Sequence, residues 1–186
     1  MHAIRYDIFL AGPFFNEQQV MLCRDIYELL IDKGFKVFWS YEETGQTKIE
    51  DDADAWSLFY RNAEAVKESR MMLAIMDWLN MPGSKVVLQQ LQDLRSSKET
   101  PLCIPDSGTV WECGMAYAME KPVYLFTTRP RDRRVNIMLT QCSRGVIHGM
   151  EQLKKVLVCR SAAAQTGQPG PYIREAEIAD WGGRHQ

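Results

Sequence analysis

The chain has 186 residues, 46% of them hydrophobic and 25% charged, and a net charge of −2 at neutral pH. A chain of this size fits one globular domain with a full hydrophobic core. Its slightly negative net charge disfavours binding to a nucleic-acid polymer. No apolar run is long enough to span a membrane. The five scattered cysteines show no CxxC spacing and the N-terminus no signal-peptide pattern, so we expect a cytoplasmic protein without disulfides or a metal site.

The pattern of residues 6–39 predicts a strand, a helix and a second strand. Residues 6–11 (YDIFLA) are rich in strand formers and end at Gly12, and residues 35–39 (FKVFW) have the same character. Between them, apolar residues recur at helical spacing over residues 16–33, and Gly34 ends this helix.

The middle of the chain predicts a loop, a helix and a buried strand. Residues 40–52 are polar and indicate a loop, and residues 71–76 (MMLAIM) are a continuous apolar run typical of a buried strand. We expect residues 77–105 to form an excursion above the sheet, with one candidate helix over 86–94. The helix expected over residues 53–70 has these apolar residues on one face: Trp56, Phe59 or Tyr60, Ala63 and Val66.

The last part of the chain continues the alternation and ends in a tail. Residues 161–186 are rich in Gly, Pro and Gln, and we expect this tail to be loosely held. The predicted elements are a helix over 107–120, strands over 123–127 and 145–148, a short helix near 136–141 and a helix over 151–158. A basic loop follows the strand over residues 123–127, and it would bind a phosphate or form a solvated run of charges. Its basic residues are Arg129, Arg131, Arg133 and Arg134.

Strands that alternate with helices predict the fold class. The pattern is typical of an α/β domain, a Rossmann-like (flavodoxin-like) parallel sheet with helices on both faces, over residues 1–160. Ligands of such sheets bind beyond the carboxyl ends of the strands, where the turn at Gly12 and Phe14, Asp77 and the basic loop would lie. Neither GxGxxG nor GxxxxGK[ST] occurs, which disfavours dinucleotide and P-loop binding.

Two carboxylates stand around the start of a helix in residues 106–118 (DSGTVWECGMAYA). Paired carboxylates at such a place suit chemistry at a sugar anomeric carbon, one as nucleophile and one as acid. Glu112 lies about one turn into the helix, where the N-terminal dipole would keep it ionised, as a nucleophile requires. The alternative makes Asp106 an N-cap and Glu112 a solvated carboxylate. Gly114 costs about 1 kcal/mol against Ala inside a helix, which predicts a packing or access reason.

Four separated pieces of the sequence resemble the nucleoside 2-deoxyribosyltransferase family, which also contains nucleotide N-glycosidases. The most specific is DSGTVWECGMAYA, which is similar to the family's DxGTxxExGxAxA core. Residues 8–14 (IFLAGPF) and Arg61-Asn62 with the strand that follows resemble two further segments. Residues 135–139 (VNIML) are similar to an Asn-Leu-Met segment that family members lend to a neighbouring subunit's site.

The resemblance implies an enzyme that exchanges nucleobases on 2′-deoxyribonucleosides through a covalent deoxyribosyl intermediate on Glu112. It also implies that the enzyme needs no metal or organic cofactor and forms a homo-oligomer with shared sites. Glu112 takes the place of the catalytic glutamate, and Asp106 that of the acid that contacts or protonates the base. Asn62 falls where some members carry a second acid, so it would contact the base rather than transfer a proton. The other substrate-binding residues that we expect are Gly12, Phe14, Asp77, Gly108, Asn136 and Met138.

Alternatives stay open at this stage. An N-cap role for Asn136 and a core position for Met138 are as compatible with the pattern as contact with a substrate. Phe14 could stack on a base or lie in the core, and its place after the turn favours stacking. A hydrolase of nucleoside 5′-monophosphates would use water instead of an acceptor base, and the resemblance implies Ser in place of Asp106 in such members. A catalytically silent nucleotide-binding module is disfavoured because both Asp106 and Glu112 are present.

Overall fold

A computed structural model describes residues 3–44, 51–77, 105–129, 135–159, 162 and 170–178. The candidate helix over 86–94, most of the predicted excursion, and Arg131, Arg133 and Arg134 of the basic loop lie outside the described residues. Within the described residues, no helix is both long and apolar enough to cross a bilayer.

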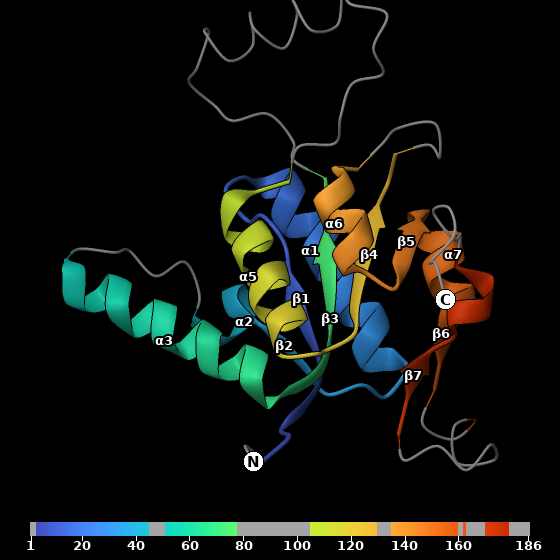
Figure 1. Ribbon diagram of the computed structural model, residues 1–186, viewed down its shortest axis with the longest axis horizontal. Helices are drawn as coiled ribbons and strands as arrows, with labels where there is room; N and C mark the ends of the chain where they lie inside the picture. Colours follow the sequence, from blue (N-terminus) through green and yellow to red (C-terminus); the bar gives the residue numbers. More distant parts are fainter. Residues whose placement is uncertain are drawn as a thin grey trace, which may run out of the picture.

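A five-stranded parallel sheet forms the centre of the molecule (Figure 1). Its order is β2-β1-β3-β4-β5, and the register pairs Ile8 with Val37 on one side and with Met71 on the other. The predicted doubly wound α/β fold is therefore confirmed. The strands are β1 (Tyr6–Ala11), β2 (Val37–Trp39), β3 (Ser69–Ile75), β4 (Val123–Thr127) and β5 (Gly145–His148).

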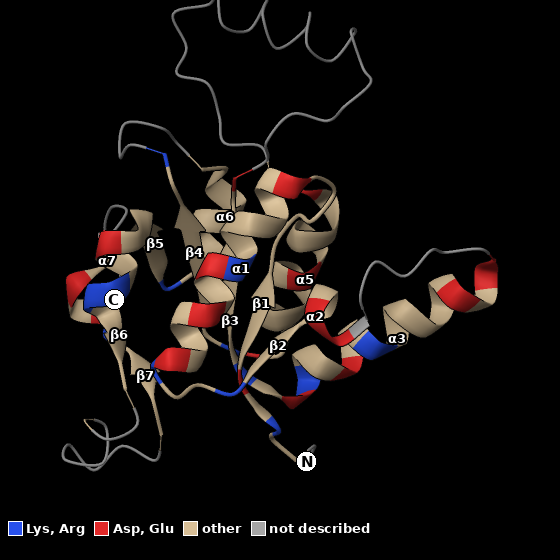
Figure 2. Cartoon of the chain, turned by 180° about the vertical axis from the view of Figure 1, so that it is seen from behind, with Lys and Arg blue, Asp and Glu red and all other residues tan. Residues whose placement is uncertain are grey.

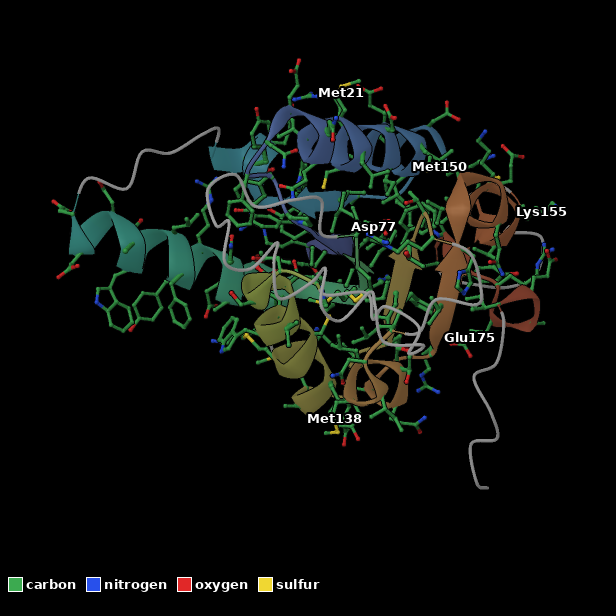
Figure 3. The ribbon with its side chains drawn as sticks, turned by 90° about the horizontal axis from the view of Figure 1, so that it is seen from above. Met21, Asp77, Met138, Met150, Lys155 and Glu175 are labelled. Atoms are coloured by element: carbon green, nitrogen blue, oxygen red, sulfur yellow. The ribbon has the colours of Figure 1, made fainter. Side chains whose placement is uncertain are left out.

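Helices cover both faces of this sheet because alternate strand side chains point to opposite faces. Ile8 and Leu10 pack in one apolar cluster with α1 (Glu17–Asp32) and α7 (Gly149–Val156). Figure 3 looks down on the carboxyl edge, with α1 on one side of the sheet and the opposite layer on the other. That layer, which packs on Phe9 and Met72, consists of α3 (Asp52–Glu68), α5 (Ser107–Ala118) and α6 (Ile137–Cys142).

Only some of the apolar residues that were expected to be buried on helix α3 are buried. Ala63 and Val66 are buried against the sheet as predicted. Trp56 and Phe59 are exposed, because the first turns of α3 extend beyond the sheet instead of lying on it (Figures 1 and 2). Figure 2 also shows acidic and basic residues interspersed along this helix.

Three further elements differ from the sequence prediction. The loop expected over 40–52 begins with a short helix, α2 (Ser40–Thr44), whose first turn holds two glutamates that suit the helix dipole. The last predicted helix ends at Val156, and Leu157–Val158 form strand β6 instead.

Part of the C-terminal tail is packed rather than loose. β7 (Tyr172–Ile173) pairs antiparallel with β6, and a single 3₁₀ turn, Glu175–Glu177, follows it. Ile173 and Ile178 are buried in the same cluster as α1 and α7, and the Tyr124 hydroxyl donates a hydrogen bond to Glu175 at 2.8 Å. These contacts are long-range, so composition alone did not indicate them.

Candidate active site

Asp106 caps helix α5 and keeps one carboxylate oxygen for another partner. Its Oδ2 accepts hydrogen bonds from the backbone N–H of Thr109 at 3.0 Å and from the Thr109 hydroxyl at 3.4 Å. Its Oδ1 has no hydrogen bond to any described residue. A Cβ added at Gly108 would lie 3.0 Å from Oδ2, so the glycine keeps the cap free of crowding. The N-cap role is therefore real, and it does not compete with a role toward a substrate.

Glu112 lies on the side of α5 that faces α3, opposite Asn62. The Asn62 side chain donates a hydrogen bond from Nδ2 to Glu112 Oε1 at 3.5 Å. The other amide atom, Oδ1, is buried and has no hydrogen-bond partner among the described residues. A buried carbonyl oxygen without a partner costs free energy, so this atom is suited to accept a hydrogen bond from a bound molecule. The structure thus joins two predicted site residues that lie fifty positions apart.

The sequence predicted that Glu112 is ionised, and this prediction is wrong for the unliganded protein. Burial, and after it the negative charge of Asp106, raise the pKa of Glu112 from 4.5 to about 8. The helix dipole fades within the first turn, whereas Glu112 lies in the second, so desolvation decides the outcome. The carboxyl group is therefore mostly protonated at neutral pH and ionises near pH 8.

This pKa predicts the pH dependence of any reaction in which Glu112 is the nucleophile. We expect kcat/KM to rise about tenfold per pH unit below pH 8 and to level above it, because only the anion attacks. In Asp106→Asn the midpoint should move to lower pH, since the neighbouring charge is gone. Asp25→Asn, on the exposed side of α1, is the matched control and should leave the midpoint unchanged. An identical midpoint in all three proteins would contradict this account.

The turn after β1 is held by side chains from α1. Asn16 caps α1, and Gln19, which is buried, accepts a hydrogen bond from the backbone N–H of Phe15 at 2.9 Å. A Cβ at Gly12 would meet Ile75 at 3.1 Å, so the glycine is needed for packing. Phe14 is partly buried, with its ring centroid 5.8 Å from those of Phe15 and Tyr41. Gln19 was not predicted from the sequence, although the Asn-x-x-Gln spacing resembles a capping box.

Asp77 joins the carboxyl ends of β3 and β4 above the centre of the sheet (Figure 3). It is buried, and its oxygens accept hydrogen bonds from the Thr127 hydroxyl at 2.8 Å and the backbone N–H of Thr128 at 2.6 Å. Arg129 Nε lies 3.8 Å from the same carboxylate. Its position at the carboxyl edge of the sheet is as expected, and contact with a substrate stays a prediction.

Asn136 and Met138 lie on the other side of α5 from Glu112. Asn136 caps α6, accepting a hydrogen bond from the backbone N–H of Met138 at 2.8 Å. Met138 is 76% exposed and points away from the body, so a core position is excluded (Figure 3). Both residues line an apolar groove of about 730 Å³ between α5 and α6, together with Val110, Gly114, Tyr117 and Leu139.

The helical geometry of α5 separates this groove from Glu112. Residues advance by about 100° around an α-helix, so Val110 and Gly114 lie about 160° from Glu112 and Tyr117 about 140°. Asn136 therefore faces away from the Glu112 of its own chain.

In the described part of the chain, no three His, Cys, Asp or Glu side chains gather as metal ligands.

Comparison with known proteins shows the family of the chain. Residues 8–157 match the model of the nucleoside 2-deoxyribosyltransferase family, whereas no curated protein matches the chain. Similar solved structures include a 2-deoxyribosyltransferase from Bacillus psychrosaccharolyticus (TM-score 0.60, 22% identity, 89% of this chain and 98% of that one). Another is a conserved protein from Enterococcus faecalis V583 (TM-score 0.58, 17% identity, 80% and 94%). The family match covers most of the chain and includes Asn62, Asp106, Glu112 and Asn136, and the chain belongs to the nucleoside 2-deoxyribosyltransferase family.

Proposed function

We propose that the protein exchanges nucleobases on 2′-deoxynucleosides through a deoxyribosyl ester on Glu112. One observation supports this above all: Glu112 is held by Asn62 beside the capping carboxylate of Asp106, in a chain of the deoxyribosyltransferase family. A partly buried carboxyl group near a second carboxyl group is what retaining glycosyl transfer requires.

The reaction runs in two displacements at C1′ of the sugar. A carboxylate oxygen of ionised Glu112 attacks C1′, and the bond from C1′ to the base nitrogen breaks with its electron pair going to the base, which takes up a proton from solvent. A second base then attacks C1′ through a ring nitrogen, breaks the ester bond to release Glu112 as a carboxylate, and loses its own proton to solvent. Two inversions give overall retention. Asp106 supports departure of the base or binds the sugar through its unoccupied Oδ1.

The environment of Asp106 favours substrates without a phosphate. The first free N–H groups of a helix are a ready site for an anion, but in α5 Asp106 already occupies the N–H of Thr109. A 5′-phosphate close to this carboxylate would be repelled in a poorly solvated site. A 5′-hydroxyl would instead donate a hydrogen bond to Oδ1.

We therefore expect higher kcat/KM for deoxynucleosides than for their 5′-monophosphates, and Asp106→Ser should narrow or reverse this preference. The measurement compares both substrate classes on both proteins, with a second base present and then absent, by chromatography of the products. Asp25→Asn serves as the control for loss of a carboxylate elsewhere. A wild type that clearly prefers the monophosphate, and releases the base without an acceptor, would instead indicate a nucleotide N-glycosidase.

The position of Asn136 supports sites shared between subunits. Because Asn136 faces away from its own Glu112, it would complete the site of a neighbour. Glu112→Ala and Asn136→Ala should each be nearly inactive, and mixing the two under conditions of subunit exchange should restore part of the activity, because a mixed oligomer contains one site with both native residues. No recovery despite proven exchange would show that Asn136 serves its own chain or none.

A further inference from the structure

The side-chain amide of Asn62 lies between α3 and α5 and has a different environment at each end. Its Nδ2 donates a hydrogen bond to Glu112 Oε1 at 3.5 Å. Its Oδ1 is buried, and no described residue donates a hydrogen bond to this atom. A buried carbonyl oxygen without a donor costs free energy in the free protein. A bound molecule that brings a donor to Oδ1 removes this cost, so the amide presents a hydrogen-bond acceptor to a ligand.

The hydrogen bond from Asn62 acts on a carboxyl group that has few other polar neighbours. In the described part of the chain, the Glu112 side chain forms one hydrogen bond, which comes from Asn62. The strands beneath this layer present apolar side chains such as Met72 and Leu125 to it. The charged and titratable groups on the surrounding helices are Asp106 and Cys113 on α5, Cys142 on α6, and Arg61 and Glu64 on α3, the last two being paired with Glu43 and Lys67. Both thiols are neutral because burial raises their pKa.

The amide of Asn62 can take two orientations toward Glu112, and the charge of the carboxyl group selects between them. An ionised carboxylate only accepts hydrogen bonds, so the amide must turn Nδ2 toward it and leave Oδ1 for a ligand. A protonated carboxyl group can instead donate its O–H to Oδ1, which leaves the amide N–H groups for the ligand. The ionisation of Glu112 and the kind of ligand group that Asn62 can bind are therefore linked.

We infer that Asn62 couples recognition of the nucleoside to activation of Glu112, as a specificity-determining residue of the proposed base exchange, on which this inference rests. A donor of the bound nucleoside, either an N–H of the base or a hydroxyl of the sugar, binds Oδ1 and holds Nδ2 toward Glu112. This hydrogen bond stabilises the carboxylate form, and the proton of Glu112 passes to solvent. Linkage makes the effect reciprocal, so ionised Glu112 favours binding of the donor by the same factor.

This coupling provides a nucleophile that a suitable substrate activates. Without a ligand, burial and the charge of Asp106 hold the pKa of Glu112 at about 8, so most molecules carry a carboxylic acid at neutral pH. A pKa that is lower by one pH unit in the complex raises the ionised fraction at neutral pH about fivefold. A nucleoside without the donor would still bind, but it would react slowly because Glu112 stays protonated.

Recognition by Asn62 is measured first as binding to Glu112→Gln, which cannot form the ester and whose amide oxygen still accepts from Nδ2. Calorimetry compares deoxyadenosine with purine 2′-deoxyriboside, which lacks only the amino group, and with 2′,3′-dideoxyadenosine, which lacks only the 3′-hydroxyl. The ligand without the donor for Oδ1 should bind at least about tenfold more weakly than deoxyadenosine, since that oxygen stays unpaired. A matching set derived from deoxycytidine covers a preference for pyrimidines.

The loss of affinity must depend on Asn62. In Glu112→Gln/Asn62→Ala the weakened ligand should bind as deoxyadenosine does, whereas Glu112→Gln/Ser57→Ala, which removes an exposed hydroxyl from the same helix, should still discriminate. Equal binding of all three ligands by Glu112→Gln, or discrimination that persists without Asn62, would overturn the inference. Circular dichroism first establishes that each variant is folded, and Asn62→Leu replaces Asn62→Ala if that variant is not.

The coupling to Glu112 is measured in the pH dependence of base exchange by the wild type. The midpoint of kcat reports the complex, so it should lie at least about one pH unit lower for the deoxynucleoside than for the analogue without the donor. The midpoint of kcat/KM reports the free protein and should be the same for both substrates. Asn62→Ala should remove the difference in kcat, and Ser57→Ala should keep it. Equal kcat midpoints in the wild type would overturn the coupling.

The outcomes separate this inference from the proposed function. A wild type that exchanges no base, while Glu112→Gln selects ligands through Asn62, would refute the proposed function alone. The coupling is then measured as release of a proton when deoxyadenosine binds the wild type, by calorimetry in two buffers of different ionisation enthalpy, and binding without proton release would overturn it. Base exchange without selection by Asn62 would overturn the inference and leave the proposed function standing.

Discussion

Replacement of Glu112 by Gln is expected to lower the rate of base exchange at least about 10³-fold while the chain stays folded. Gln has nearly the shape of Glu and can keep the contact with Asn62, but its amide cannot form the glycosyl ester. Removal of the covalent route therefore leaves only direct displacement, which the site is not arranged to assist. Initial rates with a deoxynucleoside and an excess of a second base provide the measurement.

Glu151→Gln is the control for this experiment, because Glu151 is an exposed glutamate on α7 whose side chain forms an ion pair with Lys154 and lies away from α5. It should retain wild-type rates. Mass spectrometry of acid-quenched wild type should also find a deoxyribosyl adduct on the peptide that contains Glu112. Near-normal turnover by a folded Glu112→Gln protein would exclude Glu112 as the nucleophile.

The same substitution is expected to stabilise the protein at alkaline pH. Burial raises the pKa of Glu112 to about 8 in the folded state, against 4.5 for an exposed glutamate. Below pH 4.5 both states are protonated and Glu112 contributes nothing to this balance. Between pH 4.5 and 8 the unfolded chain ionises first, so the free energy of unfolding falls by about 1.4 kcal/mol per pH unit, and above pH 8 the loss is constant.

The amide side chain that replaces Glu112 does not titrate, so the variant avoids this loss. The free energy of unfolding of Glu112→Gln relative to wild type should therefore increase between pH 5 and pH 9 by an amount on the order of 3–5 kcal/mol. Urea denaturation at both pH values measures the difference, and Glu151→Gln should show no such change. A difference that stays constant with pH would mean that Glu112 is not desolvated in the folded protein.

The predicted loss of activity and gain of stability at alkaline pH in Glu112→Gln have one cause, the desolvation of Glu112. A carboxyl group surrounded by water ionises easily, but it is a poor nucleophile toward an anomeric carbon. The water molecules around it must be removed before it can attack. Partial burial next to Asn62 and Asp106 removes that water in advance, at a cost to folding. Loss of stability at alkaline pH is the expected signature of such a site.

The sequence alone predicted the sheet and most helix positions, and it placed Asp106 and Glu112 around the start of a helix. This succeeded because hydrophobic periodicity and capping are local properties: the alternation of strands and helices, and an Asp three residues before Thr109, can be seen within a few neighbours. The family resemblance rested on equally local motifs, above all the segment from Asp106 to Ala118.

The way in which these pieces act together follows from the folded structure. The contact of Asn62 with Glu112, the protonation of Glu112 and the packing of Ile173 in the core depend on residues far apart in the chain. The exposure of Trp56 has the same origin, since a helical pattern shows an apolar face but not whether the sheet extends far enough to cover it. Burial and the proximity of charges are properties of the assembled layers, and local sequence does not contain them.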